Sequence, residues 1–205
     1  MPPVDSDEAL LASWRDGDQR AGRTLFARHV DRISRFFFSK VSTGVDDLVQ
    51  RSFLALLERS RDLPAGVPVR AYLFGIARNL LLHRFRDEYR DGRHFDELTT
   101  SVAALGATPS VLIDKRQQLQ LLYAALQGLP LDLQITLELF YWEELPAGEI
   151  GSVLGVPEGT VRSRLRRARQ LLGEGLKALG PALAEPTLAD LERWARELRD
   201  RIGRS

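Results

Sequence analysis

Arginines crowd one short segment of the chain, and their chemistry points to an anionic partner. Five of the eight residues from Arg162 to Arg169 are arginines, and no acidic residue lies among them. A guanidinium group donates a planar fork of hydrogen bonds that fits phosphate oxygens and the edge of guanine. Because nothing within the run offsets the repulsion between these charges, we interpret the segment as a nucleic-acid contact. A solvated helix hairpin with a basic surface is the plainer alternative.

The residues around this run are typical of a helix-turn-helix. An apolar face of Ile150, Val153 and Leu154 predicts a short helix. Gly155 would end that helix, since glycine readily takes the left-handed conformation found at helix C-termini, and Pro157 can begin the next one. The second helix carries an apolar stripe at spacings of four, three and four, formed by Val161, Leu165, Ala168 and Leu172. The arginines lie on its other faces, as expected for a helix that enters the major groove of DNA.

A second basic segment lies between Arg70 and Arg93, and aromatic residues are interleaved with its arginines. Basic groups beside aromatic rings suit single-stranded DNA, because rings stack on bases while cations follow the backbone. Tyr72, beside a loop that contains prolines, is the aromatic residue that we expect to contact DNA. Phe74 and Phe85 are expected to belong to the core.

The composition argues against several other kinds of chemistry. The 205 residues include no cysteine, and the three histidines have no metal-ligand spacing. With no nucleophile–base pair and no phosphate-binding glycine loop, we expect no catalytic residue, no metal and no cofactor. Basic and acidic residues nearly balance, at 29 and 28, so the positive charge is concentrated locally. The sequence begins without a signal peptide and has no bilayer-length apolar run, so we expect a cytoplasmic protein without membrane insertion.

Helical periodicity recurs along the chain and strand signals are nearly absent, so the expected fold class is all-α. We expect two small helical domains joined by a flexible linker, the second containing the helix-turn-helix, and a C-terminal amphipathic helix. Outside the helix-turn-helix, helices are predicted at residues 7–16, 19–41, 46–59, 71–90, 111–127, 131–142 and 187–202. The last has a capping-box pattern at Thr187 and Asp190 and an apolar stripe around Trp194. This stripe is expected to pack on the chain's own domains or on an external partner.

From about Asp7 to Leu179 the chain resembles the extracytoplasmic-function sigma factors, the smallest class of the sigma-seventy family of promoter-recognition subunits of bacterial RNA polymerase. Three segments carry the resemblance in the family's order: residues 46–54 (DDLVQRSFL), residues 70–80 (RAYLFGIARNL), and Leu129-Pro130 with the helix-turn-helix. The resemblance implies a region-2-like domain at 7–93, a linker at 94–112, a region-4-like domain at 113–179 and an extension at 180–205.

The resemblance also implies roles for individual residues and partners. The residues that would dock on the clamp helices of core RNA polymerase are Asp46, Asp47, Gln50 and Phe53. The residues that would recognise and melt the minus-ten element, beside a loop at 60–70 that holds a flipped base, are Arg70, Tyr72, Arg78, Asn79 and Arg84. The residues that would read the double-stranded minus-thirty-five element are Thr160, Arg162, Ser163, Arg164, Arg166, Arg167 and Arg169. Of these, Arg164 and Arg169 are expected on phosphates, and an anti-sigma factor is a further partner that the family implies.

Three residues depart from the family's pattern. An acidic residue is usual where Arg51 stands, tryptophan is common in place of Tyr72, and alanine is usual in place of Gly151. The main alternative is a helix-turn-helix regulator that acts without replacing the polymerase's sigma subunit, which would need a sensory N-terminal domain that usually contains strands. A nucleic-acid-processing enzyme is a second alternative, and it would change its substrate without any polymerase.

Overall fold

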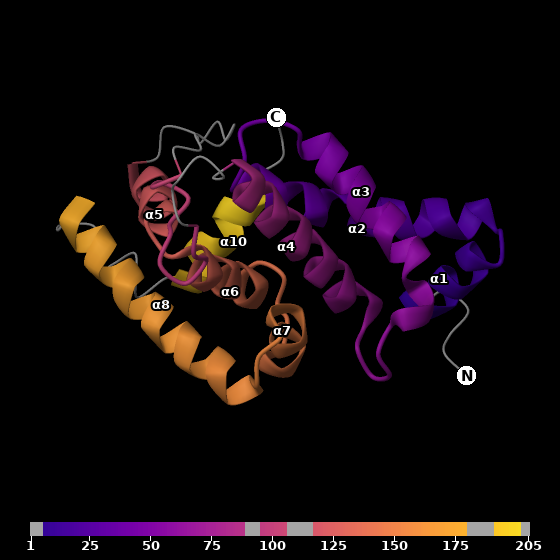
Figure 1. Cartoon of the computed structure of the whole chain (residues 1–205). Coiled ribbons are helices and arrows are strands. Elements are labelled where there is room, and N and C mark those ends of the chain that lie inside the picture. Colours follow the sequence, from indigo (N-terminus) through magenta and orange to yellow (C-terminus); the bar gives the residue numbers. More distant parts are fainter. Residues whose placement is uncertain (1–5, 89–94, 106–116, 180–190, 202–205) are drawn as a thin grey trace.

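The computed structural model describes residues 6–88, 95–105, 117–179 and 191–201 (Figure 1). Its helices are α1 (Asp7–Arg15), α2 (Gln19–Phe38), α3 (Val45–Glu58), a 3-10 turn (Ser60–Asp62), α4 (Val69–Glu88), α5 (Gln117–Gln127), α6 (Leu131–Tyr141), α7 (Ala147–Leu154), α8 (Glu158–Leu179) and α10 (Leu191–Arg201). Within these ranges, strand pairing is limited to one isolated bridge between Ser101 and Pro130. The all-α prediction is therefore confirmed where the structure describes the chain. Residues 89–90, 111–116, 187–190 and 202 of the predicted helices lie outside the described ranges.

Helices α1 to α4 form one half of the molecule around a core of aliphatic and phenylalanine side chains. The first two helices begin at side-chain caps: Ser6 Oγ accepts from the Ala9 N–H, and Asp18 Oδ1 accepts from the Arg20 N–H. Large side chains that are almost completely buried in this half include Leu25, Ile33, Phe37, Leu48, Leu56, Leu73, Phe74, Leu81 and Phe85. The prediction that Phe74 and Phe85 are core residues is confirmed.

Helices α7 and α8 form the helix-turn-helix that the sequence predicts. Gly155 ends α7 in the left-handed region with φ of +68°, and the predicted stripe on α8 is buried. The structure also accounts for Gly151 where the family usually has alanine. A Cβ at this position would lie 2.7 Å from the carbonyl oxygen of Val156, so the turn approaches the helix too closely for a side chain.

Part of the expected flexible linker packs on the second half. The Thr100 carbonyl accepts from the Leu131 N–H at 2.9 Å, and the Glu97 carbonyl accepts from the Asp132 N–H at 3.1 Å. Val102 is completely buried. Residues 95–105 are thus hydrogen-bonded to the start of α6 and differ from a free linker. Residues 94 and 106–112 of the expected linker lie outside the described residues.

The C-terminal helix α10 packs back on this chain, against α5 and α6. Its Leu191 and Ala195 are buried, and Arg199 Nη1 donates to the Trp142 carbonyl at 3.0 Å. The predicted capping box and the Trp194 side chain lie outside what the structure describes.

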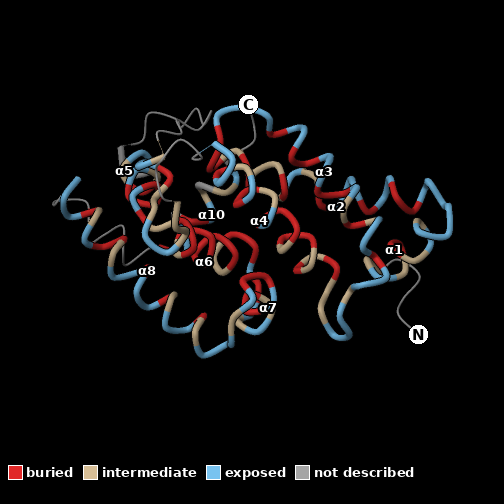
Figure 2. Tube along the Cα trace, viewed as in Figure 1, coloured by how far each residue is buried: buried red, intermediate tan, exposed pale blue. Residues whose placement is uncertain are grey.

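The two halves lie directly against each other, with α4 packed on α7 (Figure 1). A Cβ at Gly75 of α4 would lie 3.9 Å from the Val153 Cα of α7, which is ordinary van der Waals contact. Figure 2 shows buried residues running through α4 and α6, whereas exposed residues follow the outer faces of α3 and α8. Helices α4 and α6 are therefore covered on several sides, because each half supplies part of the other's cover.

Candidate nucleic-acid interface

The outer face of α8 carries most of the arginines that the sequence singles out. Arg162, Arg166, Arg167 and Arg169 are exposed there, together with Ser163, whose hydroxyl donates to the half-buried Thr160 at its carbonyl (2.8 Å). Arg162 Nη2 lies 2.5 Å from Glu158 Oε1, so the acidic residue just before the run offsets one of its charges. The buried stripe fixes the helix, and the arginines project away from it. This face can therefore contact a polyanion without any change in the core.

Arg169 is held in place by two aromatic residues of α6. Its Nε donates to the Tyr141 hydroxyl at 2.7 Å, and its guanidinium carbon lies 5.5 Å from the Tyr141 ring centroid and 5.7 Å from that of Phe140. The hydrogen bond and the cation–π contacts limit the conformations of this side chain. A guanidinium held in this way has less freedom to lose when it binds a phosphate.

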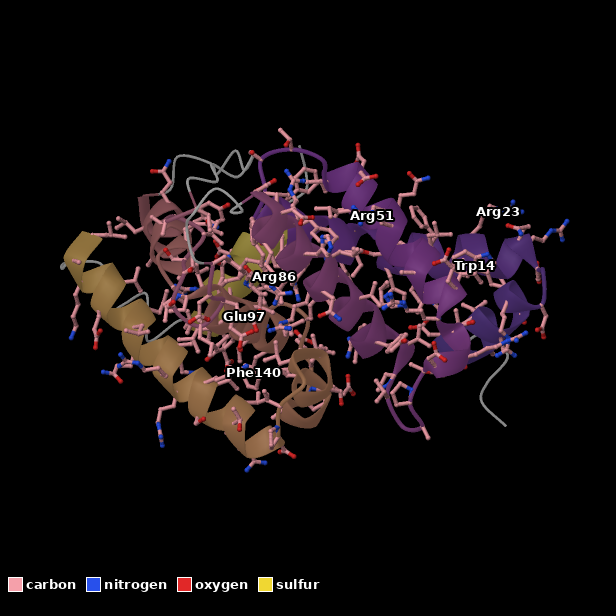
Figure 3. The ribbon with its side chains drawn as sticks, viewed as in Figure 1. Trp14, Arg23, Arg51, Arg86, Glu97 and Phe140 are labelled. Carbon is pink, nitrogen blue, oxygen red and sulfur yellow. The ribbon has the colours of Figure 1, made fainter. Side chains whose placement is uncertain are left out.

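Arg164 points the other way, into the molecule. It forms an ion pair with Asp132 of α6, whose side chain is 1% exposed. The opposite oxygen of the same carboxylate accepts from Arg78 Nη2 of α4 at 2.8 Å, and Arg78 also donates to Glu97 at 2.8 Å. Glu97 lies within 3.8 Å of Arg86 as well, near the centre of Figure 3. Two arginines expected on DNA thus meet at one buried carboxylate.

A cavity of about 520 Å³ lies between α4 and the helix-turn-helix, beside the contact of Gly75 with Val153. Tyr72 and Asn79 of α4 line one side, and Ser152 and Gly155 line the other. Three of the predicted minus-ten residues, Tyr72, Arg78 and Asn79, therefore line this cavity. The helix-turn-helix forms its opposite wall.

The other two predicted minus-ten arginines, Arg70 and Arg84, are not among the residues that line this cavity. Arg70 Nη1 donates to the Glu143 carbonyl at 3.3 Å, and its Nη2 lies 3.7 Å from Glu149 Oε2 of α7. Arg84 instead donates to the Thr43 carbonyl at 2.7 Å, in the turn that precedes α3. The structure thus brings Tyr72, Asn79, Arg70 and Arg78 to the junction between the halves, and leaves Arg84 apart from them.

The predicted polymerase-docking residues lie at the start of α3. Asp46, Asp47 and Gln50 are exposed, whereas Phe53 is 3% exposed and packs on Phe26 with ring centroids 4.6 Å apart. Three of the four residues are accessible, and the aromatic ring supports the helix from inside. The next residue, Leu54, is an exposed apolar residue at this surface, and so is Phe26.

The departure at Arg51 has a local consequence on the same helix. Its Nη1 lies 3.6 Å from Asp47 Oδ2, and both side chains are more than half exposed. Figure 3 labels Arg51 on α3. Such a solvated i,i+4 pair contributes little to stability. It leaves the acidic start of α3 accessible.

A buried ion pair connects the residues just after α2 with α6, at the junction between the two halves. Lys40, just after α2, is completely buried and pairs with Glu138, which is 2% exposed. Burial lowers the pKa of Lys40 from its ordinary value, while Glu138 opposes that shift. Nearby, burial lowers the pKa of Arg35, and Arg32 pairs with Glu143 at 3.0 Å.

Sequence reasoning missed Lys40, Asp132 and Glu138. Each stands in an apolar context. Lys40 comes two residues after a run of three phenylalanines, and the two acids lie in a helix whose isoleucine and most of whose leucines are buried. Charged residues in such surroundings need partners, and this was the available signal. Among the described residues, no group of acids and histidines could hold a metal ion, and no helix is long and apolar enough to cross a membrane.

Two family profiles match the chain, one on each half. The profile described as Sigma-70 region 2 matches residues 25–91, and the profile described as Sigma-70, region 4 matches residues 119–172. The RNA polymerase sigma factor HrpL of Pseudomonas syringae pv. syringae is 32% identical over 152 residues, which cover 72% of this chain and 82% of that one. The RNA polymerase sigma factor CarQ of Myxococcus xanthus is 32% identical over 171 residues, covering 80% and 96%.

Two solved structures share the arrangement of helices. CnrH in complex with the cytosolic domain of CnrY is 28% identical, with a TM-score of 0.60 over 84% of this chain and 97% of that one. The sigma factor RpoE of Bartonella quintana, in complex with the anti-sigma factor NepR, is 26% identical, with a TM-score of 0.54 over 72% and 92%. The regulator alternative would need a sensory N-terminal domain, which usually contains strands, and the regular secondary structure of described residues 6–88 is helical.

Proposed function

The chain belongs to the sigma-70 family, in its extracytoplasmic-function group, and from this membership we propose how its residues divide the work of promoter recognition. As an RNA polymerase sigma factor, the protein confers promoter choice on the core enzyme. Sigma factors are non-catalytic initiation factors. We therefore infer that this chain performs no covalent chemistry and acts in the cytoplasm, beside polymerase and DNA.

The outer face of α8 is proposed to read the minus-thirty-five element. The observation that carries this assignment is the row of exposed arginines on a helix whose opposite stripe is buried. Arg162 and Arg166 are proposed to contact base edges, and Arg169, fixed by Tyr141, to contact a phosphate. Arg164 is assigned to this surface only after its contact with Asp132 opens.

Run-off transcription with core polymerase tests the function, and a promoter panel tests the division of roles. Arg162→Ala and Arg166→Ala should each lower discrimination among minus-thirty-five variants by about 1–3 kcal/mol, the usual loss for a bidentate base contact. Arg169→Ala should weaken all variants alike. The same profile for all three variants would refute the division, and a wild-type protein that directs no transcript would refute the function.

The α4 side of the cavity is proposed to hold a base of the melted minus-ten element. Tyr72 lines the pocket and supplies a face for stacking, and Asn79 supplies hydrogen-bonding groups beside it. Tyr72→Ala should impair strand opening more than initial binding. Permanganate reactivity of promoter thymines measures opening, and a premelted template should restore part of the activity.

The exposed acidic start of α3 is proposed to dock on the clamp helices of core polymerase. Asp46→Lys combined with Asp47→Lys should abolish co-purification with core while leaving the fold intact, because both side chains are exposed. Glu58→Lys, at the exposed opposite end of the same helix, is the matched control. Equal core binding by both variants would refute the docking assignment.

An anti-sigma factor is proposed as a regulator, because two structural relatives were solved with CnrY and NepR. Affinity capture on the full chain from its own host, followed by a test of whether the captured protein blocks run-off transcription, examines this proposal.

A further inference from the structure

A second cavity, of about 240 Å³, lies between α2, the start of α4, the residues that follow α6 and the C-terminal helix α10. Among the described residues, none lines both this cavity and the one that Tyr72 lines, and none of those lining it belongs to α8. Seven of its eight lining residues are charged, and four of these are arginines: Arg32, Arg35, Arg70 and Arg199. Pockets for drug-sized ligands measure roughly 300–1,000 Å³, so this cavity suits a smaller, charged ligand.

The positive charge around this cavity exceeds the buried negative charge beside it. Of the three acids that the structure shows in the lining, Glu143 is the buried one, with a side chain 6% exposed, and it pairs with Arg32 at 3.0 Å. The Glu144 and Asp200 side chains are 71% and 56% exposed, so water screens their charges. An anion in the cavity would therefore meet a local excess of guanidinium groups.

Arg35 is the residue of the cavity with an unsatisfied hydrogen-bond donor. Its Nε is buried, and no described residue accepts a hydrogen bond from it. Burial lowers the pKa of Arg35 and Glu143 opposes this shift, but arginine stays protonated in proteins, so the side chain is a cation. A buried donor without an acceptor is unfavourable, and the oxygen of a phosphate is an acceptor that suits a guanidinium.

The residues that follow α6 hold two of the other arginines in place. The Trp142 carbonyl accepts from Arg199 Nη1 at 3.0 Å, and the Glu143 carbonyl accepts from Arg70 Nη1 at 3.3 Å. Arg70 Nη2 lies 3.7 Å from Glu149 Oε2, which is longer than a hydrogen bond. These guanidinium groups are thus positioned by backbone carbonyls and keep further N–H groups for a ligand.

We propose that this cavity binds the phosphate group of a compact ligand, through Arg35 of α2 and Arg199 of α10. A guanidinium donates a planar fork to two phosphate oxygens, and arginines from several helices can hold the two phosphates of a diphosphate. Arg199 lies beyond residue 172, where the region-4 match ends, so part of the site comes from outside the two matched regions. The site goes beyond the proposed promoter-reading function and does not depend on it.

Isothermal titration calorimetry of the full chain with pyrophosphate tests this site. We expect saturable binding at one site, and Arg35→Met should weaken it by about tenfold or more, because a hydrogen bond between charged groups is lost. Arg23→Met is the matched control, since it removes the same charge from the exposed start of the same helix, labelled in Figure 3. Arg23 is roughly 18 Å from Arg35 along the helix, beyond the Debye length of about 8 Å, so its loss should change the affinity by less than about twofold.

A variant that gains affinity keeps the test sharp even where Arg35→Met does not fold. Glu144→Gln removes an exposed acid from the lining and should strengthen pyrophosphate binding by about twofold, a gain that unfolding cannot produce. Unchanged or weaker binding by this variant, folded by circular dichroism, would overturn the proposal.

A nucleoside diphosphate distinguishes the two sources of such a phosphate group. Binding of GDP as tight as that of pyrophosphate would indicate the diphosphate of a nucleotide, and binding of pyrophosphate alone would indicate the free anion. No saturable binding of either up to about 1 mM would overturn the proposal. A greater loss with Arg166→Met, on the outer face of α8, than with Arg35→Met would place the anion on the DNA-reading surface and would also overturn it. A wild-type chain that binds pyrophosphate but directs no transcript would refute the proposed function alone.

Discussion

The buried Lys40–Glu138 pair offers the sharpest test of how the two halves are held together. The Lys40 ammonium donates to the Phe36 carbonyl and to Ser39 Oγ, both at 2.8 Å, and lies 4.1 Å from the Phe36 ring centroid. Glu138 accepts in addition from Ser39 Oγ at 3.3 Å and from Gln134 Nε2 at 2.8 Å. Both charges are therefore desolvated and well hydrogen-bonded, and each half of the molecule supplies one of them.

The two charges depend on each other, so removing one should cost far more than removing both. Glu138→Leu leaves a buried ammonium without its counter-ion, which costs about 3–5 kcal/mol of unfolding free energy. Lys40→Met likewise leaves the Glu138 carboxylate buried without its counter-ion, at a similar cost. Replacing the pair by Lys40→Met with Glu138→Leu removes both desolvation penalties and should be neutral to within about 1–2 kcal/mol. Since a domain is stable by about 5–15 kcal/mol, the single changes should be conspicuous.

Urea unfolding of the four proteins, followed by circular dichroism, gives the coupling energy of this cycle. The exposed Asp47–Arg51 pair provides the control, because its atoms are 3.6 Å apart and both side chains are more than half exposed. Its cycle with Asp47→Asn and Arg51→Gln should give a coupling below about 0.5 kcal/mol. A coupling for Lys40 and Glu138 as small as that of the control would mean that the pair is solvated and that the halves are not joined there.

Three further predictions address the turn, the pH dependence and the phosphate contact. Gly151→Ala should lower the free energy of unfolding by about 1–3 kcal/mol, because the added Cβ meets the carbonyl of the following turn at 2.7 Å, whereas Gly159→Ala meets nothing within 4 Å and should gain up to about 1 kcal/mol. Urea midpoints that shift in the same direction would refute this turn geometry. Burial lowers the pKa of His29 below its ordinary value of 6.5. As the pH falls through about 6.5, the unfolded chain therefore binds a proton before the folded protein does, so the free energy of unfolding should be at its full value above that pH and decrease below it. His29→Gln should reduce this pH dependence of the free energy of unfolding, measured by urea titrations between about pH 5 and 7.5. Tyr141→Phe removes the hydrogen bond to Arg169 and should weaken binding of promoter DNA by the holoenzyme by about 0.5–1.5 kcal/mol, with an unchanged salt dependence. Arg169→Ala should instead reduce the slope of log affinity against log salt concentration by about one. Equal slopes in the two variants would show that Arg169 does not contact a phosphate.

The helices at the outside of each half were predictable from the sequence, because each of them buries a single apolar stripe that appears as a helical periodicity of apolar residues. The stripe of α8 and the left-handed Gly155 follow from local chemistry, and both are as expected. Helices α4 and α6 are different, since they contact the other half as well as their own. Their buried residues include polar groups such as Arg78 and Gln134, which a stripe rule assigns to solvent.

The part of the candidate site that depends only on the buried stripe of α8 was also predictable from the sequence. Spacing along α8 placed Arg162 and Arg166 correctly on the outer face, because that face is defined by the buried stripe alone. Spacing did not distinguish Arg164 from the exposed arginines. Arg164 forms an ion pair with Asp132 of α6, and helical periodicity does not show which charged residue of another helix a side chain will contact. Phe53 is similar: its packing on Phe26 of another helix depends on tertiary structure.

The contacts between the halves were the least predictable part, although the sequence contains the evidence that they exist. A buried charge costs free energy unless it is paired, so an acidic residue within an apolar helix such as α6 indicates that a basic residue from another segment contacts it. Asp132 and Glu138 are two such acids, and Lys40 and Arg78 are the cations that meet them across the junction. Spacing along the chain cannot match acids to cations, because 54 residues separate one pair and 98 the other. Pairings of this kind come from tertiary structure, because only the folded chain brings an acid of one half within reach of a cation of the other.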